Sequence, residues 1–199
     1  MNYFLDTEFI ESGKRKTIDL VSIGIVAEDG RKYYAISNQF NPKLAVDPIA
    51  ILAINKLPER PENLLPPQEE SPRRWEESRS WKSLELIKHD LFDFIVPDEK
   101  GIIFWGAWSA YDWVTFCQLF GDMRHLPDGY PYYCNDVIQW MNQLGLTREF
   151  LPPEPENSHN ALADAQWVKE SYDALKQYGD NQRRRRPDGK PAGLKDGSH

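Results

Sequence analysis

Three short acidic motifs carry the residues in this chain that could do chemistry. They are DTE at 6–8, AYD at 110–112 and HNALAD at 159–164. Together they supply four carboxylates and one histidine, in the order Asp-x-Glu, Asp, His-x4-Asp: Asp6, Glu8, Asp112, His159 and Asp164. Carboxylate oxygens are preferred ligands of Mg²⁺ and Mn²⁺. Two such ions can clamp the attacking and leaving oxygens of a phosphodiester displacement.

The histidine completes this inventory, because an unperturbed imidazole titrates near neutrality and can deprotonate an attacking water. Each motif also has a simpler interpretation when taken alone. Asp6 and Glu8 could mark the exit of a strand to solvent. Asp112 could complement a helix dipole, and Asp164 could lie on the rim of a helix with His159 in solvent. The whole set favours a metal-dependent hydrolase.

Predicted elements place these motifs on a mixed sheet and its helices. Strands are expected at 2–6, 18–28, 32–37 and 101–107, with a hairpin turn at 29–30. Helices are expected at 48–56, 81–95 (capped by Ser80), 109–120, 136–144 and 158–178. Side chains two apart on a strand share a face, so Asp6 and Glu8 should point the same way at the end of the first strand. The element order predicts an α/β domain with a mixed sheet.

Composition limits the class of protein. The 199 residues include 24 basic and 31 acidic side chains, a net charge of −7, which argues against coating of polyanions by bulk charge. An apolar content of 40% excludes a wholly disordered chain. Two cysteines do not form a disulfide framework, and neither a signal peptide nor a membrane span is recognised. We therefore expect a cytoplasmic protein without membrane contact.

Two stretches depart from the pattern of a folded domain. Residues 58–74 hold five prolines among many charges and are expected to form a surface loop or mobile flap. We assign no role to the stretch up to residue 79. After residue 179 the apolar periodicity stops. The prediction is a domain at 1–179 and a basic, disordered tail at 180–199, whose arginines at 183–186 could grip phosphates or remain solvated.

The three motifs resemble those of the DEDDh family of 3′-5′ exonucleases, a branch of the ribonuclease H-like superfamily. Over residues 1–175, longer segments such as YFLDTEFIE and AYDWVTFCQLFG are similar to the bacterial exoribonuclease AS group and, more distantly, to ribonuclease T. The resemblance implies a ribonuclease H-like mixed sheet of five or six strands with flanking helices. It also implies two Mg²⁺ ions, with Mn²⁺ as a substitute, and a homodimer.

The resemblance further assigns roles to matching positions. Asp6, Glu8 and Asp164 would ligate the metals, with Asp6 bridging both. Asp112 would hold the second ion, and His159 would be the general base. The implied activity releases nucleoside 5′-monophosphates from single-stranded, adenylate-rich RNA 3′ ends. Alternatives are an exonuclease for DNA or short oligoribonucleotides, and a non-catalytic RNA-binding protein of the same fold.

Stacking on aromatic rings can hold an unpaired strand end without a sequence code. Phe9, directly after the acidic motif, is the best placed ring, and core packing is its alternative role. Trp81, Trp108 and Trp113 are further candidates. Many relatives in the resembled family carry Asn where this chain has Trp108, so a polar substrate contact from that position is not expected here.

Overall fold

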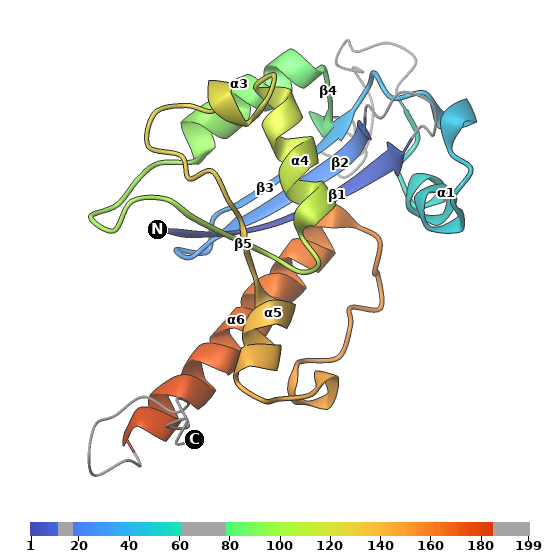
Figure 1. The fold of residues 1–199 in the computed structure, drawn as a ribbon. Coiled ribbons are helices and arrows are strands. Elements are labelled where there is room, and N and C mark those ends of the chain that lie inside the picture. The colour runs from blue at the N-terminus through green and yellow to red at the C-terminus, as the bar shows by residue number, and fades with distance from the viewer. Residues whose placement is uncertain (12–17, 61–78, 185–199) are drawn as a thin grey trace, which may run out of the picture.

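A computed structural model describes residues 1–11, 18–60 and 79–184. Its centre is a six-stranded mixed sheet in the order β4-β3-β2-β1-β5-β6 (Figure 1). The strands are β1 Asn2–Glu11, β2 Ile18–Ala27, β3 Lys32–Ser37, β4 Trp81–Lys82, β5 Ile103–Gly106 and β6 Asn135–Asp136. The strands β1, β2 and β3 pair antiparallel, and the remaining pairs are parallel. The expected α/β fold with a mixed sheet of five or six strands is confirmed.

Helices cover both faces of this sheet. The α-helices are α1 Pro48–Asn55, α3 Leu84–Phe94, α4 Ala110–Leu119, α5 Val137–Gln143 and α6 Ala161–Arg184. Short 3₁₀ turns lie at Pro42–Leu44, Met123–His125 and Arg148–Phe150. Along β1, Tyr3 and Leu5 pack in one core with α3 and α4, whereas Phe4 packs in a second core with α5 and α6. The alternation of the strand therefore assigns each side chain of β1 to one helical layer.

Three element boundaries differ from the sequence expectation. The first strand does not end at Asp6 but continues to Glu11, because β2 pairs with it along its whole length. The predicted helix at 81–95 is instead a short strand followed by a helix from residue 84. Trp81 pairs with Ile36 of β3, and Ser83, not Ser80, caps the helix by accepting a hydrogen bond from the amide of Leu86.

The last helix begins and ends later than the predicted 158–178, since it spans Ala161–Arg184. In Figure 1 its C-terminal part extends beyond the edge of the sheet. Residues 180–184 of the expected tail are thus helical, whereas 185–199 and most of the proline-rich stretch, 61–78, lie outside the described residues. No helix in the described ranges has the length and apolar character that a membrane crossing requires.

Candidate active site

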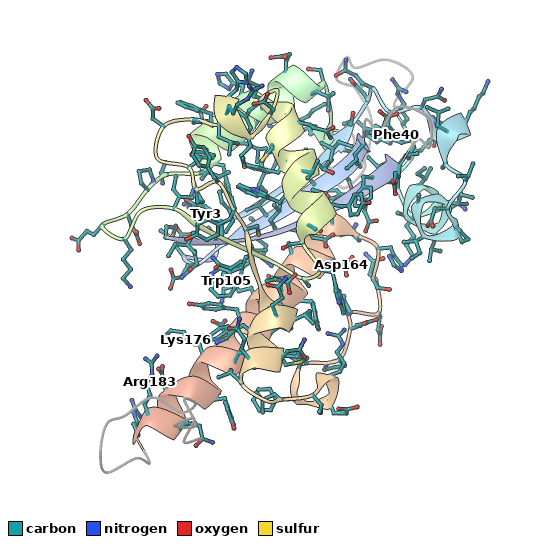
Figure 2. All side chains as sticks on the ribbon, in the orientation of Figure 1. Tyr3, Phe40, Trp105, Asp164, Lys176 and Arg183 are labelled. Atoms are coloured by element: carbon teal, nitrogen blue, oxygen red, sulfur yellow. The ribbon has the colours of Figure 1, made fainter. Side chains whose placement is uncertain are left out.

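Three carboxylates from β1 and α6 converge on one point. Asp6, Glu8 and Asp164 each offer an oxygen, and these oxygens all lie within 4.8 Å of one another. Asp6 and Glu8 share the face of β1 on which Phe4 packs with residues of α6. Figure 2 shows Asp164 at the N-terminal end of that helix. Three carboxylates at this spacing form a donor set that suits a divalent cation.

The start of α6 is held against β2 by a glycine. Gly24 is paired with Asp6 across the β1–β2 ladder, and a Cβ built at Gly24 would lie 2.2 Å from the carbonyl oxygen of Ala161. Only a residue without a side chain allows this approach. Asn160 then caps the helix by accepting a hydrogen bond from the amide of Ala163 at 3.1 Å. The Asp164 carboxylate accepts one from the Asn160 amide at 3.1 Å, which fixes its direction.

The fourth predicted carboxylate, Asp112, lies in the first turn of α4 and contacts β1 between the two acids of the first motif. Its Oδ1 accepts hydrogen bonds from the Thr7 amide at 2.9 Å and the Thr7 hydroxyl at 2.6 Å. The parallel pairing of β5 with β1 ends at Phe4. Beyond that point none of the described strands pairs with β1 on this side, and Asp112 bonds to this edge of β1. The structure thus gathers three carboxylates in one group and places Asp112 beside them.

A second glycine positions α4 in the same way. A Cβ at Gly106 would lie 2.5 Å from the Cβ of Ser109, so the turn from β5 into α4 requires glycine there. Asp136 caps α5 and also accepts a hydrogen bond from the Ser109 amide at 3.0 Å. Asp136 was not among the predicted site residues. Its side chain ties the beginnings of α4 and α5 together.

The enclosed carboxylates repel one another and are poorly solvated. Burial, followed by the charges of the three neighbouring carboxylates, raises the pKa of Asp6 well above its usual range. Burial and the nearby Asp164 and Asp112 raise the pKa of Glu8 to about 8. Burial also raises the pKa of Asp164, and that of Asp112 to about 6 despite the opposing hydrogen bonds from Thr7. Such a cluster is stable in its charged form only beside a cation.

Lys56 is a site residue that the sequence analysis missed. It follows α1, and its Nζ donates a hydrogen bond to the carbonyl oxygen of Ser158. Its positive charge lowers the pKa of Glu8 and so opposes the effect of burial. It also lowers the pKa of Asp164, on which burial and local hydrogen bonds have larger effects. No motif links this lysine to the acids in sequence, and only the packing of α1 against β1 brings it there.

His159 stands in the loop that Lys56 holds. It is half-buried and has a left-handed backbone with φ of 62°. A positive charge on its ring would lower the pKa of Asp164, which places the imidazole within electrostatic range of that carboxylate. The structure thus brings the predicted base and the predicted metal ligands to one end of the sheet.

The four aromatic candidates separate into accessible and buried rings. Phe9 is half-buried and stacks on Tyr111 of α4, with ring centroids 5.7 Å apart and planes at 14°. Trp108 is 62% exposed. Trp113 is a core residue, and Trp81 is buried against Phe40. The rings of Trp81 and Trp113 are buried in the interior instead of facing the site, so neither residue is retained as a stacking candidate.

The sequence matches the model of the family described as the 3′-5′ exoribonuclease Rv2179c-like domain over residues 1–175. The chain belongs to this exoribonuclease family. It is 41% identical over 166 residues to the 3′-5′ exoribonuclease Rv2179c of Mycobacterium tuberculosis H37Rv. The aligned region covers 83% of this chain and 87% of the relative. The 3′-5′ exoribonuclease MT2234.1 of M. tuberculosis CDC 1551 / Oshkosh matches to the same extent. The expectation of a 3′-5′ exoribonuclease is therefore confirmed.

The range matched by the family model, residues 1–175, includes every acid of the cluster, His159 and Lys56. The solved structures that match include two at low identity. One is a chain in the structure of the yeast NOT1 MIF4G domain co-crystallized with CAF1, with a TM-score of 0.48 and 12% identity over 94% of this chain and 82% of that chain. The other is Pop2p of S. pombe in its Mg²⁺- and Mn²⁺-bound form, with a TM-score of 0.43 and 13% identity over 95% of this chain and 85% of that one. The family assignment rests on the sequence matches.

Proposed function

We propose that this exoribonuclease shortens single-stranded, adenylate-rich RNA from its 3′ end and releases nucleoside 5′-monophosphates by a two-metal mechanism. The observation that carries the proposal is the group of three carboxylate oxygens within 4.8 Å, with Asp112 beside it. The motif order supports assignment to the DEDDh branch. Membership in an exoribonuclease family supports RNA as the substrate.

The donor set fits divalent ions. Asp6, Glu8 and Asp164 would hold one ion, with Asp6 shared by the second and Asp112 contributing to it. Oxygen-only ligands favour Mg²⁺, with Mn²⁺ as a substitute. The raised pKa values support a cation at this point, because bound positive charge would remove the mutual repulsion of the acids. When bound, the two ions would stabilise the charge that develops on the attacking and leaving oxygens.

The chain's own side chains would provide the remaining steps. His159 would accept the proton of the attacking water and pass it to solvent after cleavage. Its neighbour Ser158 is bonded to Lys56, which restrains the loop that carries the base. The hydrogen bonds that Thr7 donates would keep the Asp112 carboxylate oriented. These contacts fix the catalytic groups before the substrate arrives, which lowers the cost of orienting them.

The strand end would be held by stacking. Phe9 directly follows the acidic motif, and Tyr111, which supports its ring, directly precedes Asp112. A base stacked on this pair would gain about 1–3 kcal/mol without sequence selectivity.

We also expect two copies of the chain to associate and the enzyme to act in the cytoplasm. Sedimentation of the purified protein tests the first expectation, and localisation of a tagged chain tests the second.

The decisive experiment uses 5′-labelled oligoadenylate with Mg²⁺. Stepwise shortening from the 3′ end should appear, and it should disappear both on addition of EDTA and in Asp6→Ala. Cleavage that persists in EDTA would exclude the two-metal mechanism. Equal turnover of oligoadenylate and oligouridylate would remove the adenylate preference and leave the exonuclease assignment intact.

Two alternatives are separated by matched substrates. Faster turnover of a deoxyribo-oligomer than of the same ribo-oligomer would indicate a DNA exonuclease, since a 2′-hydroxyl contact distinguishes the two. Turnover confined to oligomers of two to five nucleotides would indicate an oligoribonuclease. Tight RNA binding without cleavage in Mg²⁺ or Mn²⁺ would indicate a non-catalytic RNA-binding protein.

A further inference from the structure

An arginine lies between two indole rings at the edge of the candidate site. The guanidinium of Arg148, in the 3₁₀ turn Arg148–Phe150, is 5.1 Å from the ring centroid of Trp108 and 4.4 Å from that of Trp167. Arg148 also forms an ion pair with Glu154 at 2.6 Å. Trp167 is buried, and its indole nitrogen donates to the carbonyl oxygen of Pro152 at 3.0 Å. The inner ring and the arginine are thus fixed by several partners.

This stack links the segment that enters α4, the helix of Asp112, to α6, the helix of Asp164. Trp108 precedes Asp112 by four residues at the entry to α4. Trp167 follows Asp164 by three residues on α6, and residues at this helical spacing have Cβ atoms about 5–6 Å apart. Trp108 lies just outside α4, two residues before its first residue. Trp167 lies about one helical turn from Asp164 on α6.

The backbone of Trp108 is strained. Among the residues that the structure describes, only Trp108 (φ 51°) and His159 (φ 62°) adopt a left-handed conformation without being glycine. A bulky residue in this region costs about 1–3 kcal/mol and persists only where the surroundings hold it. Trp108 precedes Asp112 by four residues, and His159 precedes Asp164 by five. Strain of this kind is concentrated at functional sites.

The indole of Trp108 is nevertheless mostly in solvent. Arg148 covers one face of the ring, and 62% of the residue remains exposed. A tryptophan whose only task was to join α4 to α6 would gain more from burial. The strained backbone of Trp108, the exposure of its ring and the rigid support from Arg148 together indicate a surface that binds a flat ligand.

We propose that the open face of Trp108 is a second base-stacking platform, on which a nucleobase upstream of the RNA 3′ end rests. The proposal builds on the proposed function, which supplies the single-stranded substrate. Phe9 and Tyr111 would hold one base, and Trp108 another. Because Arg148 and Trp167 already fix the indole, little side-chain entropy is lost when a base stacks on it. The platform would therefore tighten binding of longer strands without a base preference.

Trp108→Asn tests the platform, because Asn tolerates left-handed backbone and the variant loses the ring without added strain. Binding of 5′-fluorescein hexa-adenylate, whose 3′ end is free to enter the site, is measured by anisotropy with Mn²⁺ in an Asp6→Asn background, where cleavage should be blocked. We expect Trp108→Asn to weaken binding of the hexamer about tenfold. Trp108→Phe, which keeps a ring, should recover most of it. Phe92→Asn removes a ring of similar exposure on α3 and should leave binding unchanged.

Steady-state cleavage separates a platform from a clamp between helices. With Asp6 intact, Trp108→Asn should raise KM for hexa-adenylate about tenfold, change KM for di-adenylate little, and leave kcat unchanged on both. Unchanged hexamer binding in Trp108→Asn would overturn the proposal, and an equal loss of kcat on both lengths would assign the ring to positioning of α4 and α6. If the wild type cleaves no RNA but Trp108→Asn still loses hexamer binding, the platform stands and the proposed function fails.

Discussion

Gly24 and Ala161 approach so closely that a methyl group on Gly24 would lie 2.2 Å from the Ala161 carbonyl oxygen. This contact sets the distance between β2 and the first turn of α6. Asp164 stands one turn further along that helix, and Asp6 is the residue paired with Gly24 on β1. A glycine on a strand that contributes no carboxylate to the cluster therefore controls the spacing of that cluster.

The first prediction follows from this contact. Gly24→Ala should push α6 away from the sheet and separate Asp164 from Asp6 and Glu8. We expect a loss of kcat of at least about tenfold, because displacement of a catalytic group by about 1 Å can cost far more. Gly179→Ala is the matched control, since Gly179 lies in α6 with no atom within 4 Å of an added Cβ. The control should keep full activity and gain about 0.5–1 kcal/mol of stability. Full activity of Gly24→Ala, measured on oligoadenylate, would contradict this account.

The second prediction concerns the hydroxyl that orients Asp112. Thr7→Val removes the 2.6 Å hydrogen bond but keeps the backbone contact at 2.9 Å. Because that hydroxyl lowers the pKa of Asp112 against the effect of burial, its loss should raise this pKa further. Under the proposed mechanism, the second ion should then bind more weakly. We expect kcat at low Mg²⁺ to fall about tenfold, in line with the value of a hydrogen bond to a charged group. Thr7→Ser keeps the hydroxyl and should retain most activity. A titration of rate against Mg²⁺ checks both variants, and identical curves for Thr7→Val and the wild type would count against the role.

The third prediction is a pH-dependent stability that appears only without metal. The folded-state pKa values of Asp6, Glu8 and Asp164 are raised by burial, so these groups favour folding when protonated. Their contribution is complete below the unfolded-state pKa and is lost as pH rises through the folded-state pKa, which for Glu8 is about 8. In EDTA, Tm should therefore fall by about 3 °C or more from about pH 5 to about pH 8. Added Mn²⁺ should abolish the fall, because bound ions stabilise the ionised acids. Thermal melts across this range provide the measurement, and a flat Tm in EDTA would be inconsistent with the cluster.

The fourth prediction separates two effects of Lys56. Its positive charge interacts with the same acids as an incoming metal ion and repels that ion. Its Nζ also holds the loop that carries His159. Lys56→Met should therefore bind Mn²⁺ a few-fold more tightly but turn over RNA about tenfold more slowly. Lys56→Arg should restore most of the turnover, since it can donate to the Ser158 carbonyl oxygen. Calorimetric Mn²⁺ titration and steady-state kinetics test the pair. General unfolding would lower metal affinity and turnover together, so tighter binding with slower turnover is diagnostic.

The exoribonuclease activity and three of the acids that gather in one group were predictable, because these depend on residue types and their order. Asp6, Glu8, Asp112, His159 and Asp164 follow the order of a known set of motifs, and the predicted elements placed each beside a strand or helix. The period of two along β1 also predicted that Asp6 and Glu8 share a face. These are local properties, which a linear pattern can carry.

The errors arose where tertiary contacts override local pattern. Trp81 has helical spacing to the apolar residues after it, yet pairing with β3 draws it into a strand and buries its ring. Trp113 is likewise buried in the core. Lys56 has no sequence link to the acids, because α1 is placed by packing and not by spacing along the chain.

The sequence by itself determined the mixed α/β sheet, through the order and periodicity of its elements, and the identity of the carboxylates that the chain offers. The exoribonuclease family followed from its resemblance to known sequences over residues 1–175. Only the tertiary structure decided how closely the acids approach one another, and which rings stay in solvent. Those properties depend on contacts between segments far apart in the chain. Gly24 against Ala161 and Arg148 between Trp108 and Trp167 are such contacts, and no local pattern encodes them.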